Sequence, residues 1–190
     1  DRMVATAVEV ARLSVFDAVG RGCCEHVPVE LRSGDGATVR LRPTGYQFGR
    51  GSGQPGDWDA NWLMVRGEVR PPTGASWSFL DPCLTTWESA ELEAWLHAAS
   101  RGEVQPSTAP REDDGLLTFT EPNLAFSVQG ITDSDVALRV HFSLESAPRV
   151  PDSDSAPELY EHFVALTMTR NDLAAAAESW GADISPFPQR

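Results

Sequence analysis

Residues 61–80 read NWLMVRGEVRPPTGASWSFL, and this stretch gives the clearest indication of the fold. Runs rich in Trp, Leu, Val and Phe stand on both sides of the turn sequence PPTG at 71–74, which predicts two strands, at 61–70 and 75–80. A further strand is predicted at 38–48, where apolar residues alternate with arginines. Short strands separated by turns indicate an antiparallel meander.

A helix is predicted after the third of these strands. Thr85 and Glu88 form the T-x-x-E pattern of a capping box, in which each side chain bonds the backbone N–H of the other residue. Apolar residues then recur at helical spacing, and acidic residues load the N-terminal half, where the helix dipole favours negative charge. Gly102 is a typical helix stop, so we expect the helix to end there, before a polar loop over 103–114.

The order of strands followed by a helix recurs in the second half. Strands are predicted at the apolar runs 116–120, 124–128, 136–144 and 162–169, with a surface loop over 146–158. Asn171 is expected to cap a final, Ala-rich helix that runs through Trp180 and closes at Gly181. Because strands do not alternate with helices, the sequence favours an α+β fold. We expect one antiparallel, β-sheet-rich domain, meander or sandwich-like, with two main helices packed on it.

The length of 190 residues fits a single domain over 1–190. We expect its body to span 38–185, with residues 1–37 forming an N-terminal extension or the first strands. No apolar run approaches the roughly 20 residues of a membrane helix, and the N-terminus lacks the pattern of a secretion signal. Cys23, Cys24 and Cys83 match no zinc or redox spacing, which favours reduced thiols of unassigned role and a cytoplasmic location.

The charge balance is strongly acidic. There are 28 Asp and Glu residues against 15 basic residues, all of them arginine, which gives a formal net charge of -13. A field of this sign repels nucleic acid and anionic membrane surfaces and attracts basic proteins. Surplus acid also keeps a protein soluble, so charge alone does not decide between a basic partner and solubility.

The sequence lacks the common motifs of catalysis. Gly-rich nucleotide loops, HExxH, GxSxG and SxxK are missing, and a P-loop cannot form without lysine. The four histidines are scattered, which is typical of hydrogen-bonded structural residues. The segment DWDAN at 57–61 begins like a calcium loop, but the glycine and the distal glutamate of such a loop are missing. We therefore predict no enzyme activity, no cofactor and no metal.

Tryptophan is abundant, with six residues, and Trp58 is the one that we expect to be partly exposed. It stands between Asp57 and Asp59, beside a Gly-rich loop. An aromatic ring flanked by carboxylates is a good anchor for a basic protein partner. We therefore predict Asp57, Trp58, Asp59 and Trp62 as partner-binding residues. The alternative is that Trp58 folds back over the edge of the sheet.

Six segments, taken in order, resemble the WapI family of immunity proteins, which are found beside contact-dependent or polymorphic toxins in bacteria. They are GYQF at 45–48, DWDANWLMV at 57–65, W-x-F-x-DPCLTTWE at 77–88, WL at 95–96, FTEPNLAF at 119–126 and F-x-LESAP at 142–148. The resemblance covers most of the chain, about residues 38 to 185.

This resemblance implies a bacterial, cytoplasmic immunity protein. Such a protein binds and neutralises a cognate toxin domain by protein–protein interaction and is not an enzyme. The family's association with a tRNA-attacking toxin implies a basic nuclease, such as a tRNase, as one kind of partner. Toxin domains are exchanged freely, so the partner is not fixed by the resemblance.

Two other functions remain open from the residues alone. A small carbohydrate- or ligand-binding β module would need Trp58 or Trp77 to lie flat in an open groove. A hydrolase of unrecognised type would need Asp57, Asp59 or Glu121 to converge in a pocket with perturbed pKa values.

Overall fold

The computed structural model describes residues 29–49, 57–109, 115–149 and 158–190. The first sheet contains the strands β1 (Val29–Arg32), β2 (Thr38–Tyr46), β3 (Trp62–Arg70) and β4 (Trp77–Thr85). The second contains β5 (Leu116–Thr118), β6 (Leu124–Ile131), β7 (Asp135–Phe142) and β8 (Phe163–Thr169). The helices are α1 (Thr86–Arg101) and α2 (Arg170–Ile184). The predicted α+β fold with antiparallel sheets and two main helices is therefore confirmed.

The element order of the first half recurs in the second half. Each half is a four-stranded antiparallel meander, with its strands side by side in chain order, followed at once by one helix. All strand pairs are antiparallel neighbours along the chain, so each sheet is built from local pairings. β1 lies within the region 1–37, where an extension or the first strands were expected.

The two sheets share one core. Alternate residues of β2, β3 and β8 are buried, while β6 and β7 carry continuous buried runs. The Phe79 ring of β4 meets the Phe142 ring of β7 at 6.1 Å between centroids, which brings the two sheets together. At another point Thr167 N of β8 donates to Ser33 Oγ, just after β1, at 3.1 Å. The result is a sandwich-like pair of sheets.

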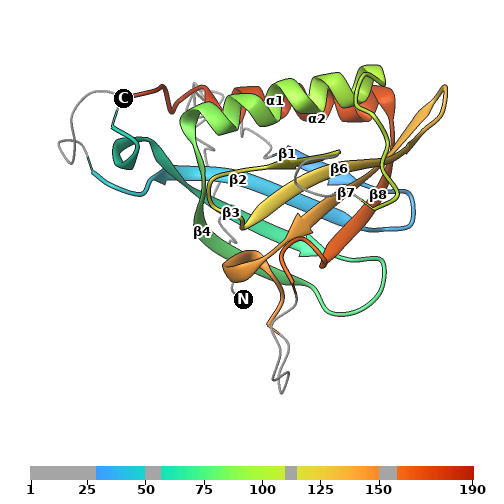
Figure 1. Cartoon of the computed structure of the whole chain (residues 1–190), viewed down its shortest axis with the longest axis horizontal. Helices are drawn as coiled ribbons and strands as arrows, with labels where there is room; N and C mark the ends of the chain where they lie inside the picture. Colours follow the sequence, from blue (N-terminus) through green and yellow to red (C-terminus); the bar gives the residue numbers. More distant parts are fainter. Residues whose placement is uncertain (1–28, 50–56, 110–114, 150–157) are drawn as a thin grey trace, which may run out of the picture.

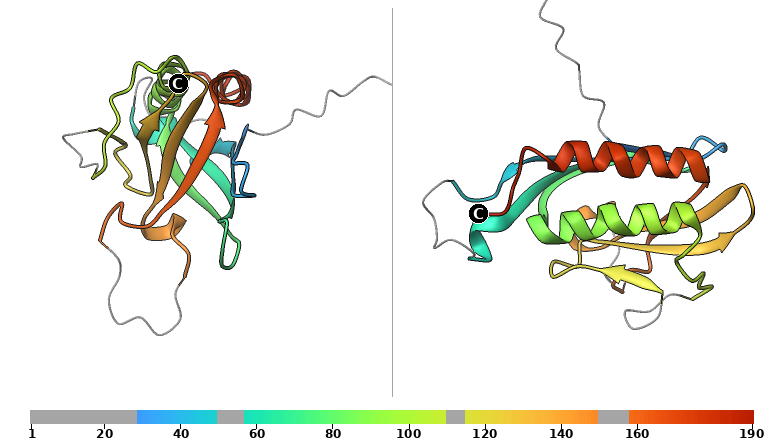
Figure 2. Two further views of the ribbon diagram at one scale, coloured as in Figure 1. Left: turned by 90° about the vertical axis from the view of Figure 1, so that its right-hand side faces the viewer. Right: turned by 90° about the horizontal axis from the view of Figure 1, so that it is seen from above.

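Both helices lie on the same side of the sheets, side by side and antiparallel (Figures 1 and 2). The fully buried Trp180 of α2 donates from Nε1 to the Ser89 carbonyl of α1 at 2.8 Å. At the opposite ends of the helices, the Arg170 guanidinium donates to the carbonyl oxygens of Arg101 and Thr132. These bonds hold α2 against α1 and against the β6–β7 hairpin.

The last helix differs from its predicted bounds at both ends. Its N-cap is Thr169, whose Oγ1 accepts from Asp172 N at 3.1 Å, so the helix begins before the expected cap Asn171. It continues past Gly181 to Ile184. A Cβ at Gly181 would lie 2.2 Å from Glu93 Oε1 of α1, so a side chain at this position would have to displace the end of the Glu93 side chain.

Candidate functional site

The predicted partner-binding residues lie just before and at the start of β3. Trp58 is 51% exposed, and its ring packs edge-to-face on Trp87 of α1, with 4.9 Å between centroids. Asp57 and Asp59 are exposed, and Trp62 is half-buried. The Trp58 ring therefore lies against the first turn of α1 while keeping half of its surface in solvent.

The buried Asn61 fixes this segment to the rest of the protein. Its Nδ2 donates to the Asp57 carbonyl at 2.8 Å, and its Oδ1 accepts from Thr86 Oγ1 at 3.0 Å and from Arg190 N at 2.8 Å. The Arg190 guanidinium also lies over the Tyr46 ring, 3.2 Å from its centroid. Asp57, Trp58 and Asp59 are thus displayed on a segment with a defined backbone.

A second group of acidic side chains forms where the two sheets meet. Asp81 comes from β4, Glu121 from the turn before β6, and Glu145 from a short 3-10 helix, η2 (Leu144–Ser146). We call these three residues the acidic cluster. Asn123, which is fully buried, lies against the cluster: its Nδ2 donates to Asp81 Oδ1 at 3.4 Å.

The backbone around the acidic cluster is held by several hydrogen bonds. The Asn123 carbonyl accepts from Ser143 N at 3.0 Å and from the hydroxyl of Ser146. Trp77 Nε1 of β4 donates to the Ser146 carbonyl at 2.9 Å, which fastens η2 onto the first sheet. The three carboxylates are therefore presented on a tied framework in which both sheets take part.

Like charges act on one another within the acidic cluster. Burial, and then the charge of Glu145, raises the pKa of Asp81, against the opposing effect of the Asn123 hydrogen bond. The pKa of Glu121 is raised by burial and then by the charges of Glu145 and Asp81. Burial, followed by these same carboxylates, also strongly raises the pKa of the Cys83 thiol. The buried Cys83 is therefore a protonated core residue; Cys23 and Cys24 lie outside the described residues.

The carboxylates predicted as hydrolase candidates do not act on one another as one group. The charges that act on Glu121 come from Glu145 and Asp81, whereas Asp57 and Asp59 are exposed on their own segment. Across the described parts of the chain, no group of three or more His, Cys, Asp or Glu side chains is placed to hold a metal ion.

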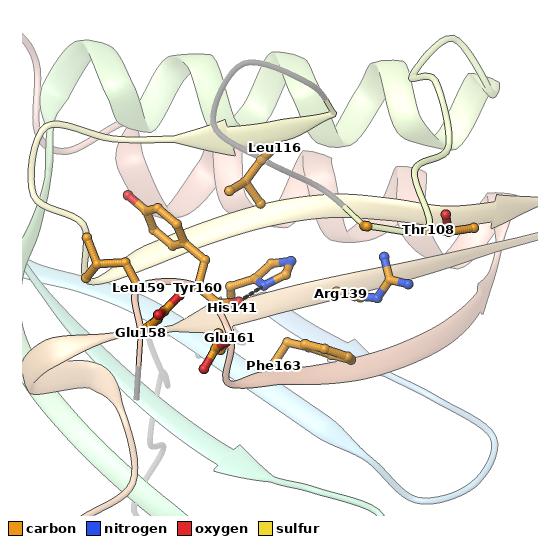
Figure 3. A pocket seen from close by; sticks show the side chains of 10 residues that line it. Thr108, Leu116, Arg139, His141, Glu158, Leu159, Tyr160, Glu161 and Phe163 are labelled. Atoms are coloured by element: carbon orange, nitrogen blue, oxygen red, sulfur yellow. Dashed lines mark hydrogen bonds between the residues drawn. The ribbon is translucent and has the colours of Figure 1, made fainter. Parts of the chain in front are cut away.

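A cavity of about 610 Å³ lies beside β7 and is lined by His141, Arg139, Tyr160 and Phe163, among others (Figure 3). His141 Nδ1 lies 2.6 Å from the Tyr160 carbonyl, so this nitrogen carries the proton, and Nε2 accepts from the Ser127 hydroxyl at 2.9 Å. Ser127 is fully buried and does not line the cavity, so its hydroxyl is not available to a substrate. His141 is the hydrogen-bonded structural histidine that the sequence predicted.

Trp77 lines a groove beside β4, but its ring is held by packing contacts and does not lie flat along the groove as a sugar-binding module would need. Its ring packs edge-to-face on Phe142 at 5.3 Å and on His162 at 5.4 Å, and its Nε1 is bonded to Ser146. The exposed Trp58 also packs edge-to-face, on Trp87. The rings of Trp58 and Trp77 are therefore both held in place by contacts with neighbouring aromatic rings.

Sequence analysis did not identify Asp81, Asn123 or Glu145 as site residues, although each lies within a segment that carried the family resemblance. Asp81 is in DPCLTTWE, Glu121 and Asn123 are in FTEPNLAF, and Glu145 is in LESAP. The structure brings these three segments together at one place.

Comparison with known proteins gives one match. The model of a family described as "Immunity protein WapI-like family" matches residues 30–188. No curated protein and no solved structure matches the chain. Among the described helices, none has the length and apolar character needed to cross a membrane.

Proposed function

Because this chain belongs to the WapI-like immunity protein family, we propose that it neutralises one cognate toxin domain by binding it directly. The family match over residues 30–188, most of the chain, is the observation that carries this proposal. The mode of action is binding and not catalysis. In support, Ser127, the hydrogen-bond partner of His141, is fully buried and does not line the cavity beside β7, and the charges that act on Glu121 come from Glu145 and Asp81 and not from Asp57 or Asp59.

The proposed partner is a basic toxin domain, such as a nuclease. A formal net charge of -13 steers a basic protein toward this chain and disfavours nucleic acid and anionic membranes. A nuclease that grips RNA needs a positive groove, and an acidic inhibitor that occupies this groove blocks the substrate. The encounter would take place in the cytoplasm, where such a toxin finds its RNA.

The proposed contact surface includes the segment from Asp57 to Trp62. Its exposed Trp58 ring, backed by Trp87, offers apolar area at little entropic cost, and Asp57 and Asp59 offer charges to a basic partner. Trp62, at the start of β3, is half-buried and keeps part of its ring available to the partner.

Co-expression with the toxin domain encoded beside this protein's gene tests the proposed function. We expect restored growth and a stable 1:1 complex in light scattering after size exclusion. A toxin that stays lethal and unbound in the presence of this protein would contradict the proposal.

The segment itself is tested by Trp58→Ala combined with Asp57→Asn and Asp59→Asn. We expect the Kd for the toxin domain to rise at least about 10-fold, because an anchor ring and two charges are lost. Leu159→Ala, which also removes an exposed apolar side chain, serves as the control and should bind like the unchanged protein.

A further inference from the structure

We propose that the cavity beside β7 receives an aspartate or glutamate side chain of the toxin domain, and that Arg139 binds its carboxylate. This inference rests on the proposed function and adds a second contact to it. Residues 57–62 do not line this cavity, so the two contacts lie on separate surfaces.

Arg139 is a buried cation to which the described parts of the chain supply no anion. It is only 6% exposed, whereas the ion pairs that described residues form with one another use Arg32, Arg40 and Arg101. Burial lowers the pKa of the Arg139 guanidinium, and no described carboxylate opposes this effect. A buried arginine is normally paired with an acid, because taking an unpaired charge out of water costs free energy. A carboxylate from a partner would supply the missing anion.

The guanidinium of Arg139 has donors to spare for a ligand. Its Nη1 donates to the Ser107 carbonyl at 3.0 Å, and this neutral oxygen is its one hydrogen-bond acceptor among the described residues. Its Cζ lies 5.2 Å from the centroid of the Phe163 ring. A guanidinium carries five N–H donors in a planar fork, which matches the two oxygens of a carboxylate. Since Arg139 lines the cavity, a carboxylate placed there can be bound by two parallel hydrogen bonds.

The acidic side chains that line the same cavity do not serve Arg139. Glu158 and Glu161 are exposed, and Figure 3 shows both on the far side of His141 from Arg139. Leu159 also lies at that far end, outside the proposed contact. His141 offers no competing charge, because burial lowers its pKa. The Arg139 end of the cavity therefore holds a positive charge that the described acids leave unpaired.

The neighbours of Arg139 across the sheet leave room for an incoming side chain. Ser127 of β6 and Ala165 of β8 stand directly opposite Arg139 in the strand register, and both are small. Ala165 is exposed, and the Phe163 ring on the same face of β8 is 44% exposed. A side chain from outside can therefore approach the guanidinium over Ala165, with the Phe163 ring beside it.

The strand beside the cavity offers a surface that suits a protein partner. The exposed residues of β8 are Phe163, Ala165, Thr167 and Thr169. None of these four is charged, although the net charge of the protein is -13. An exposed ring and short neutral side chains around a buried charge resemble the core of an interface, where apolar contacts exclude water from the charged one.

The anion that a protein partner can offer at neutral pH is a carboxylate. A basic toxin domain also carries acidic residues. One of them placed at Arg139 would fix the orientation of the complex, while the basic surface of the toxin domain meets the acids elsewhere.

The first test compares Arg139→Gln with Arg66→Gln, a control at an exposed position of β3. The Kd for the toxin domain encoded beside the gene is measured by calorimetry. Both substitutions make the protein more acidic by one charge, which on its own favours a basic partner. We expect the Kd to rise at least about 30-fold for Arg139→Gln and to change less than about 3-fold for Arg66→Gln. Equal Kd values for the two variants would overturn the inference.

The second test gives Arg139 a carboxylate of its own. Ala165→Glu places an acid opposite Arg139 at an exposed position, and Ala165→Gln is the control of equal size. We expect the Kd of the Glu variant to be at least about 10-fold higher than that of the Gln variant, because the new acid occupies the guanidinium and repels the incoming carboxylate. Equal losses would mean that charge at Arg139 plays no part. This pair decides the question if circular dichroism shows that Arg139→Gln does not fold.

A double-mutant cycle separates a direct contact from a structural role of Arg139. Each surface Asp and Glu of the toxin domain is changed to Asn or Gln and combined with Arg139→Gln, or with Ala165→Glu if the former does not fold. We expect one acid to show coupling, so that the double variant loses at least about 10-fold less affinity than the two single losses predict. Coupling to no acid would mean that Arg139 acts only through the fold.

The unchanged protein separates this inference from the proposed function. If it does not bind the toxin domain, the proposed function fails. If it binds, and the variants at Arg139 and Ala165 bind as their controls do, only the present inference is overturned.

Discussion

Gly67 of β3 shows how tightly single residues are fitted in the core. A Cβ at this position would lie 2.0 Å from Cε1 and 2.2 Å from Cζ of Phe79 on the neighbouring strand. The Phe79 ring therefore covers the Gly67 backbone, and this contact helps to place the ring against Phe142 of the second sheet. A methyl group at position 67 would displace the Phe79 ring and so disturb its contact with the second sheet.

Gly67→Ala is expected to lower the free energy of unfolding by about 1–3 kcal/mol, because the Phe79 ring must move out of its packed position. Urea denaturation measures this change. Gly45→Ala in β2 is the matched control, since a Cβ there meets nothing within 4 Å. Equal effects of the two substitutions would show that the Phe79 contact does not limit the core.

The buried His141 gives a prediction about pH. Burial, mainly, and the nearby Arg139 lower the pKa of His141 below its usual value of 6.5, against the opposing effect of the Tyr160 carbonyl. The unfolded chain then binds a proton near pH 6.5 that the folded protein does not bind, so stability is present above this pH and is lost as the pH falls.

We expect the free energy of unfolding to decrease between pH 7.5 and 5.5, and this decrease to be smaller in His141→Gln. Chemical denaturation at a series of pH values measures both slopes. Working above pH 5.5 limits the opposing contribution of Asp81 and Glu121, whose raised pKa values make protonation stabilise the fold. Identical slopes in the two proteins would exclude His141 as the source of the pH dependence.

At the scale of elements, the N-termini of α1 and α2 have the same kind of cap but differ in their hydrogen bonds to the rest of the protein. Both helices begin after a threonine N-cap. Its hydroxyl accepts a hydrogen bond from the backbone N–H of the acidic residue three positions later, Glu88 in α1 and Asp172 in α2. Glu88 is buried and also accepts from Thr120 N at 2.7 Å, so it links α1 to the turn that carries Glu121. Asp172 is exposed, and its hydrogen bonds to the described residues stay within its own cap, with Thr169.

Glu88→Ala is therefore expected to destabilise the protein by about 2–4 kcal/mol, because Thr85 N and Thr120 N lose their acceptors. Asp172→Ala, the matched change in the other helix, should cost about 0.5–1 kcal/mol. Thermal unfolding of the two variants measures the difference. A loss for Asp172→Ala as large as that for Glu88→Ala would mean that the link to the turn adds nothing.

The sequence predicts local features of these elements well. Apolar runs between turn residues located most of the strands, and the T-x-x-E pattern located the start of α1, because both signals come from residues within one turn or strand. The start of α2 was misplaced, since Thr169 and Asn171 are both good capping residues and the local sequence does not distinguish them.

The acidic cluster could not be predicted in the same way. Asp81, Glu121 and Glu145 are far apart in the chain and each belongs to a different local element. Their proximity follows from the meeting of two sheets, which no local pattern encodes. The 57–62 segment was visible in the sequence because its acids and tryptophans are adjacent.

At the scale of the whole molecule, the net charge of -13 predicts how association responds to salt. Exposed charges steer a basic partner over distances near the Debye length, about 10 Å at 0.1 M salt and about 3 Å at 1 M. We expect the association rate with the toxin domain to fall at least about 10-fold between 20 mM and 500 mM NaCl, as measured by stopped-flow fluorescence. A rate that does not change with salt would argue against a basic partner.

The adjacency of β1 and the end of α2 has a consequence for the order of the two halves. Val29 N, at the start of β1, donates to Asp183 Oδ2 near the end of α2 at 2.9 Å. A linker to Val29, in a variant without residues 1–28, would have to start beyond Arg190 so that the bond from Arg190 N to Asn61 Oδ1 is kept, and the chain could be opened between residues 109 and 115. Such a circular permutant should fold and bind as the original does, because each half is built from strands that pair in chain order and are followed by their own helix. The protein would then reach the same fold whichever of the two halves is synthesised first.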